Sequence, residues 1–206
     1  MHSAGDQDTH RPLPHGFTPG NGLRRVPRPQ DSLMRDLILP ADTGALESLR
    51  AGQELRLTGV LAAARDAAHD VFVRTGTLPF DPSEIPVYYM GPTPAPPGRP
   101  CGSCGPTTSS RMEPFIPFML ERGMRIAIGK GDMSEGTRSL FQDAGAVYMA
   151  AVGGAGALAA ESVRTRKTIA LEHLGPEAVS LITVEGFPVF VAWDLHGGNI
   201  FKRTGG

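Results

Sequence analysis

Short apolar runs alternate with helically spaced segments from about Leu33 onward. Apolar or alternating runs are typical of strands, and apolar residues recurring every three to four positions are typical of helices. The predicted strands cover residues 37–39, 55–61, 85–90, 125–128, 146–152, 179–185 and 187–194. The predicted helical segments cover residues 43–50, 62–73, 111–121 and 134–144 and the Ala-rich run after 157. This order predicts an α/β domain with a mixed sheet and flanking helices.

Two stretches lack such patterns. Residues 1–32 are dense in Pro, Gly, His, Asp and Arg, so they cannot bury enough apolar surface to offset their ordering entropy. We expect a flexible tail there, either free or wrapped over a partner, followed by one domain over residues 33–206. The Pro- and Gly-rich stretch 91–105 predicts an irregular loop, and long loops of this kind are usually functional.

The charge balance excludes binding through a whole-surface field. The chain has 20 Lys and Arg against 21 Asp and Glu, so we expect neither nucleic acid nor anionic lipid as a partner. No apolar stretch approaches the roughly 20 residues that cross a bilayer, and Met1–Arg25 lacks the apolar centre of a secretory signal. These features favour a cytoplasmic protein.

Cys101 and Cys104 form a single C-x-x-C pattern. The pattern is compatible with a redox pair, with half of a zinc site, or with two thiols in a turn. Two thiolates cannot hold a four-iron cluster, which takes roughly three or four.

The segment from Gly105 to Met112 has the strongest potential for anion binding. Thr107, Thr108 and two serines lead into a predicted helix, whose free N–H groups would favour a carboxylate. Ser110 and Glu113 have the spacing of a capping box, and Arg111 adds a planar fork for a carboxylate. The alternative is that the hydroxyls only cap a helix and Arg111 is a surface charge.

Three other places carry candidate groups. Lys130 follows a predicted strand between two glycines, but the sequence departs from a phosphate loop because Gly131 comes next. The glycine-rich turn at residues 153–157 is a candidate backbone anion site. Arg65 and His69 lie four residues apart, so a helix would place them on one face.

Taken in order along the chain, these motifs resemble the β-subunit or C-terminal domain of class I fumarases and L-tartrate dehydratases. The resemblance spans about residues 33–201 and includes L-T-G, A-R-D-A-A-H, G-P-T-T-S-S-R-M, G-K-G, G-G and E-G-F-P. The C-x-x-C pair, the Pro-rich stretch 92–100 and the N-terminal tail have no assigned role in that family.

The resemblance implies a swivelling β/β/α domain that closes on a larger part carrying a [4Fe-4S] cluster. It implies that Thr107 is the catalytic base and that the catalytic Lys130 holds the substrate carboxylates together with Arg65 and Arg111. His69 and Thr108 would also bind substrate. This chain would ligate no metal itself, since the cluster would belong to a partner α-subunit in a heterodimer or heterotetramer.

The function that follows from the resemblance is the β-subunit of an iron–sulfur hydro-lyase, active only with its α-subunit and interconverting (S)-malate and fumarate. L-Tartrate dehydratase and mesaconate hydratase are close alternatives, because one carboxylate clamp serves all three diacids. A non-catalytic dicarboxylate-binding module is a different class of reading. A third is a homologue that binds metal through Cys101 and Cys104.

Overall fold

The computed structural model describes residues 34–151 and 156–202, all within one compact unit, Ser32–Gly206. The predicted tail 1–32 and the central glycines of the 153–157 turn lie outside the described residues. No helix in the described ranges is long and apolar enough to cross a membrane.

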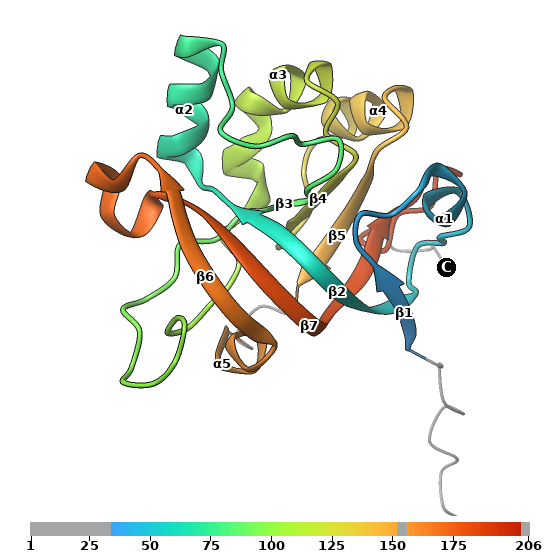
Figure 1. Ribbon diagram of the computed structural model, residues 1–206. Coiled ribbons are helices and arrows are strands. Elements are labelled where there is room, and N and C mark those ends of the chain that lie inside the picture. The colour runs from blue at the N-terminus through green and yellow to red at the C-terminus, as the bar shows by residue number, and fades with distance from the viewer. Residues whose placement is uncertain (1–33, 152–155, 203–206) are drawn as a thin grey trace, which may run out of the picture. The chain divides into compact units, whose positions relative to one another are not determined.

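The described strands form one mixed sheet that closes on itself (Figure 1). They are β1 (Arg35–Ile38), β2 (Glu54–Ala63), β3 (Val87–Tyr88), β4 (Ile126–Gly129), β5 (Val147–Ala151), β6 (Val163–Ala170) and β7 (Val179–Trp193). Their order is β1-β2-β3-β4-β5-β7-β6, with β2 also paired to β7, so strands β2 to β5 and β7 make a barrel-like ring. β1 to β5 run parallel, whereas β7 is antiparallel to β2, β5 and β6.

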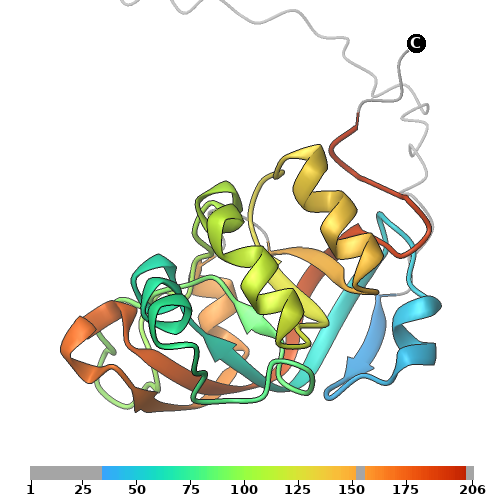
Figure 2. The ribbon, with the colours of Figure 1, turned by 90° about the horizontal axis from the view of Figure 1, so that it is seen from above.

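Helices cover the outer face of the sheet and its ends. They are α1 (Thr43–Glu47), α2 (Asp66–Thr75), η1 (Ser109–Phe115), α3 (Ile116–Glu121), α4 (Glu135–Asp143), α5 (Gly156–Glu161) and η2 (Glu172–Glu177), where η denotes a 3₁₀-helix. α2, α3 and α4 follow one another across the same face, as the view from above shows (Figure 2). The predicted α/β class with a mixed sheet and flanking helices is therefore confirmed.

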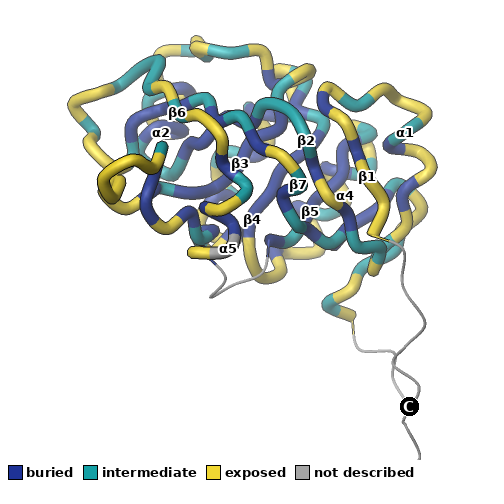
Figure 3. Tube along the Cα trace, turned by 60° about the horizontal axis from the view of Figure 1, so that its bottom comes forward, coloured by how far each residue is buried: buried dark blue, intermediate teal, exposed yellow. Residues whose placement is uncertain are grey.

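Two apolar clusters lie on the two faces of the central strands, which are buried almost throughout (Figure 3). Successive side chains of a strand point to opposite faces. Tyr88 and Met90 accordingly pack inside the ring with Phe187, whereas Val87 and Tyr89 pack under the helices. The sequence of β3 does not alternate between apolar and polar residues, because both faces of this strand pack against apolar side chains.

The clearest differences from the predicted elements concern β2, β6 and β7. Ala62 and Ala63 belong to β2 and pair with both β3 and β7, so the helix predicted over 62–73 begins only at Asp66. The two predicted final strands are one strand, because β7 continues through Gly186, which adopts φ +66° and donates its N–H to Thr58 Oγ1 at 3.1 Å. β6 was missed, because exposed Arg and Lys residues obscure its alternation.

β4 ends at Gly129, where a neighbouring loop passes at very close range. A Cβ at Gly129 would overlap the side chain of Ser109 and lie 3.0 Å from the Tyr89 ring. Gly136, in the first turn of α4, has open space around its would-be Cβ.

Gly129→Ala is expected to lower the free energy of unfolding by about 1–3 kcal/mol, because buried overpacking forces neighbours to shift. The matched substitution Gly136→Ala should be neutral or raise it by up to about 1 kcal/mol, since alanine favours helix. Urea denaturation followed by the fluorescence of Trp193 measures both. Equal effects of the two substitutions would show that Gly129 is not sterically required.

Candidate functional site

The carboxyl ends of the parallel strands β2, β3 and β4 gather the candidate residues. Arg65 follows the end of β2, and Lys130 directly follows β4. The segment 106–111 crosses these ends: Pro106 pairs with Met90, and Thr108 forms a parallel bridge with Lys130. The Thr107 N–H donates to the carbonyl of Tyr89 at 2.7 Å. Binding sites of α/β sheets usually lie at this edge.

A buried serine joins the Thr107 segment to the Lys130 loop. Ser109 is fully buried, and its Oγ accepts the backbone N–H of Lys130 at 3.0 Å. In return, the Ser109 N–H donates to the Lys130 carbonyl at 3.0 Å. The Tyr148 hydroxyl of β5 donates to Gly131 O at 2.7 Å, so at 2.8 Å it accepts the hydroxyl proton of Ser109. Each of these polar groups is therefore satisfied inside the protein, and the two loops are held in one register.

A chain of alternating charges links Glu177, Arg65, Asp66 and Arg111. Glu177 Oε1 lies 3.1 Å from Arg65 Nη2, Arg65 Nε lies 3.4 Å from Asp66 Oδ1, and Asp66 Oδ2 accepts a hydrogen bond from Arg111 Nη2. Glu177 also accepts the N–H of Ala67 at 3.2 Å, which fixes η2 against the start of α2. Asp66 and Glu177 therefore orient Arg65 and Arg111. A substrate carboxylate would bind the same two guanidinium groups.

Lys130 completes a local excess of positive charge. Its side chain is exposed, and it forms no ion pair with a carboxylate in the described part of the chain. Arg65 and Arg111 thus pair with Asp66 and Glu177, whereas Lys130 forms no ion pair among the described residues. The side chain of Arg111 is 53% exposed, so part of its guanidinium remains open to solvent.

His69 lies beneath this surface. It is 1% exposed, and its ring packs against Phe72, Tyr89 and Phe115 with centroids 5.4–5.8 Å away. Nδ1 lies 2.8 Å from the Arg65 carbonyl, which can only accept, so the proton resides on Nδ1. Burial lowers the pKa of His69 to about 4, although that carbonyl and Asp66 act in the opposite direction. His69 is therefore neutral at pH 7 and supports the backbone of Arg65.

The predicted capping box is wrong. The segment begins as the 3₁₀-helix η1 with Thr108 as its N-cap, and no side chain caps it. Glu113 instead accepts hydrogen bonds from Ser134 and from Thr137 Oγ1, the latter at 2.6 Å, and so ties η1 to the start of α4. Partial burial would raise the pKa of Glu113, but these hydrogen bonds lower it below its ordinary value. The Ser109 N–H is occupied by Lys130, so the helix start offers an anion fewer donors than predicted.

A family model described as "Fumarase C-terminus" matches residues 28–204. The chain belongs to this fumarase C-terminus family. Fumarate hydratase 1, mitochondrial, of Leishmania major is 37% identical over 155 residues, 72% of this chain and 28% of that protein. Fumarate hydratase class I, anaerobic, of Escherichia coli (strain K12) is 34% identical over the same shares of both chains.

A shorter relative aligns over most of its length. A Methanocaldococcus jannaschii protein to which the name L(+)-tartrate dehydratase subunit beta has been given is 38% identical over 172 residues, 77% of this chain and 87% of that protein. This fumarase C-terminus chain thus spans less than a third of the two fumarate hydratases but corresponds to nearly the whole of a named subunit. The resemblance inferred from the motifs is confirmed.

The described residues of this fumarase C-terminus domain do not fit an iron–sulfur cluster as ligands. No three His, Cys, Asp or Glu side chains within residues 34–151 and 156–202 could hold a metal ion. Cys101 and Cys104 are buried and face each other with Sγ atoms 2.8 Å apart. The zinc half-site reading therefore finds no further ligands in the described ranges.

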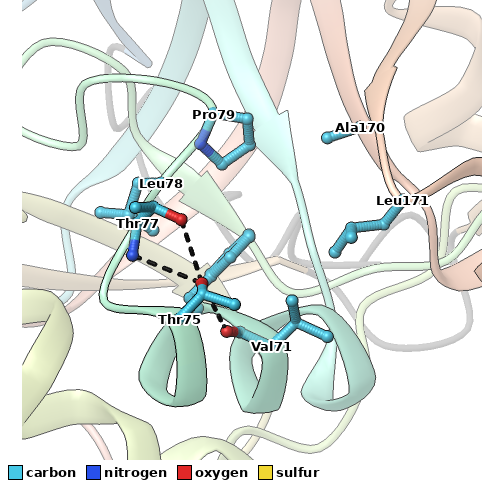
Figure 4. A pocket seen from close by; sticks show the side chains of 8 residues that line it. Val71, Thr75, Thr77, Leu78, Pro79, Ala170 and Leu171 are labelled. Atoms are coloured by element: carbon cyan, nitrogen blue, oxygen red, sulfur yellow. Dashed lines mark hydrogen bonds between the residues drawn. The ribbon is translucent and has the colours of Figure 1, made fainter.

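A separate pocket of about 280 Å³ lies at the other end of α2 (Figure 4). The last turn of α2, residues 75–79 and Ala170 with Leu171 line it. The candidate site surrounds the first residues of α2, so this pocket is not part of it.

Sequence reasoning missed the groups that orient the site. Asp66 was visible inside the A-R-D-A-A-H motif, and Ser109 inside the hydroxyl run, but neither was singled out. Tyr148 and Glu177 gave no sequence signal, because they reach the site from distant parts of the chain.

Tyr148→Phe is expected to lower the free energy of unfolding by about 1–2 kcal/mol, because it removes the hydroxyl that satisfies Ser109 and Gly131. The matched control is Tyr89→Phe. The Tyr89 hydroxyl is buried and has no hydrogen-bond partner among the described residues, so its removal should be neutral or stabilising. A larger loss for Tyr89→Phe in urea denaturation would contradict the proposed role of the Tyr148 hydroxyl.

His69 makes the stability of the fold depend on pH. Its pKa is about 4 in the folded chain against an ordinary 6.5, so the unfolded chain takes up the proton first as pH falls. The contribution is fully present above pH 6.5, and about 3 kcal/mol is lost between pH 6.5 and 4.

His69→Phe should reduce this pH dependence of the free energy of unfolding, whereas the exposed control His173→Phe should not. Urea denaturation at several pH values between 4 and 7 measures the difference. The same pH dependence in His69→Phe and the wild type would contradict the neutral, buried assignment.

Proposed function

We propose that this chain is the β-type subunit of a two-part hydro-lyase that reversibly dehydrates a 2-hydroxy dicarboxylic acid, with (S)-malate to fumarate as the leading reaction. The observation that supports it best is the convergence of Thr107 with Arg65, Arg111 and Lys130 at one sheet edge of a fumarase C-terminus domain. A diacid needs two cationic positions, and this edge offers three.

The reaction explains the need for those cations. Removing a proton beside a carboxylate builds a second negative charge, which the guanidinium and ammonium groups would stabilise. In the proposal, Arg65, Arg111 and Thr108 bind the substrate carboxylates, Lys130 stabilises the developing charge, and His69 holds Arg65 from beneath. The planar fork of an arginine suits two-point binding of a carboxylate.

Thr107 is the proposed proton-abstracting group, and it would need a second group to take up its hydroxyl proton. Its backbone is fixed by the Tyr89 carbonyl, but its hydroxyl has no hydrogen-bond partner in the described ranges. A threonine hydroxyl is a weak base at its ordinary pKa, so it needs a helper carboxylate or a proton relay. We propose that this helper comes from the partner.

The proposed partner would also supply the acid for the leaving hydroxyl. That step calls for a Lewis acid, and no three His, Cys, Asp or Glu side chains in the described ranges could hold a metal ion. We propose that an α-type subunit provides it through a [4Fe-4S] cluster. The match to nearly the full length of a named β subunit supports a separate partner chain.

L-Tartrate is the second candidate substrate. The relative whose length this chain matches carries the name of a tartrate dehydratase subunit, and the same cations would hold the tartrate carboxylates. Mesaconate hydration would use the same clamp. The alternative class, a dicarboxylate-binding module without chemistry, shares the clamp but needs no partner.

The test is to co-express the chain with a cysteine-rich α-type partner under anaerobic conditions and to measure turnover of malate, tartrate and the hydrate of mesaconate. Lactate, with one carboxylate, is the control. Activity in the complex but in neither chain alone is expected. A cluster-loaded complex that binds diacids without turning any over would favour the binding module.

Arg111→Lys in the assembled enzyme is expected to lower kcat/KM by about 100-fold, because lysine keeps the charge but loses the two-point fork. Arg122→Lys is the matched control. Arg122 lies over the ring of Phe118, away from the site, so its substitution should leave kcat/KM unchanged. Wild-type kinetics in Arg111→Lys would remove Arg111 from the site.

A further inference from the structure

Cys101 and Cys104 occupy a turn whose backbone forces their side chains together. Both residues are buried, and their Sγ atoms lie 2.8 Å apart. No other cysteine occurs in the chain, and the described residues offer no third metal ligand. Two facing thiols three residues apart have the arrangement in which disulfide exchange takes place.

The turn is clamped by Thr93 on the opposite side of the loop. The Thr93 carbonyl accepts the N–H of Gly102 at 3.2 Å, and the Thr93 N–H donates to the Ser103 carbonyl at 3.1 Å. Thr93 Oγ1 accepts the N–H of Ser103 at 2.7 Å. A Cβ at Gly102 would lie 2.9 Å from the Thr93 carbonyl and overlap its hydroxyl, so glycine is required within the turn.

The far end of the turn is anchored to the sheet. The Cys104 N–H donates to the carbonyl of Gly156 at 3.0 Å, and the Tyr88 hydroxyl donates to the Cys104 carbonyl. Backbone contacts at both ends of the turn therefore hold the two cysteines close to each other, and in this arrangement their sulfurs face each other.

Cys101 lines a pocket, although it is only 1% exposed. A pocket of about 320 Å³ is lined by Cys101, Arg99, Ser103, Glu161 and neighbouring small residues, whereas Cys104 does not line it. Arg99 is exposed at this pocket and could pair with a carboxylate of a small ligand. Burial raises the pKa of the Cys104 thiol, which disfavours its thiolate.

We propose that Cys101 and Cys104 are a redox-active dithiol, which a low-molecular-weight disulfide oxidises to an intrachain disulfide. The Cys101 sulfur attacks the small disulfide, forms a mixed disulfide and releases one thiol. The Cys104 sulfur then attacks Cys101, closes the intrachain bond and releases the second thiol. Two protein thiols lose two electrons and two protons, and the small disulfide gains both.

The cysteine pair lies close in sequence to the candidate site, so its oxidation can affect that site. Pro106, two residues after Cys104, pairs with Met90, and Thr107 follows directly. A disulfide would restrict the motion of the residues that directly precede Thr107. The dithiol itself does not depend on the proposed function, because its chemistry needs no partner chain and no diacid.

The test uses the full chain, first reduced and then incubated with oxidised glutathione. Free thiols are alkylated after unfolding, and intact mass is measured for the wild type, Cys101→Ser and Cys104→Ser. The wild type should lose both free thiols, gain no glutathione and remain monomeric. Cys104→Ser should retain one glutathione on Cys101, whereas Cys101→Ser should retain a free Cys104 thiol.

Two outcomes would overturn the proposal. Wild-type protein that keeps both thiols under these conditions would show that the pair is inert, and this result does not depend on any variant folding. Glutathione on Cys104 in Cys101→Ser, with none on Cys101 in Cys104→Ser, would reverse the assigned order of attack. Trp193 fluorescence checks that each variant is folded.

Discussion

The buried side chain of Ser109 is the contact on which the candidate site depends. It exchanges hydrogen bonds with the backbone of Lys130 and donates its hydroxyl proton to Tyr148, so two loops from different strands share one register. Gly129 leaves the space that this contact needs. Thr107 and Arg111 lie two residues on either side of Ser109, and their placement relative to Lys130 follows from it.

At the same edge, the cations that would attract a substrate carboxylate are partly neutralised by carboxylates of the chain itself. Asp66 and Glu177 orient Arg65 and Arg111 and lower the cost of gathering positive charge, while Lys130 remains unpaired among the described residues. Ion pairs between partly exposed groups contribute little to stability, so their value lies in orientation. In the proposed hydro-lyase, these oriented cations would form the substrate-binding half of the site, and the proposed partner would supply the other half.

Much of the fold could be predicted because the strands are short apolar runs, as in β4, and the helices carry apolar residues at helical spacing, as in α4. Prediction failed where tertiary contacts override local pattern. Ala62 and Ala63 favour helix by composition but pair with strands on both sides, and Glu113 caps α4 instead of its own helix. The site residues were found through motif order, but Glu177 and Tyr148 could not be, because only the folded chain brings them to the site.

The most direct test of the account is the turnover of Thr107→Val in the assembled enzyme, compared with Thr107→Ser at equal cluster content. Valine keeps the shape of threonine but removes the hydroxyl, whereas serine retains it. The account predicts that kcat falls about 10²- to 10⁴-fold in Thr107→Val, with KM nearly unchanged, and is largely kept in Thr107→Ser. Wild-type kcat in Thr107→Val would contradict the claim that this chain supplies the proton-abstracting group.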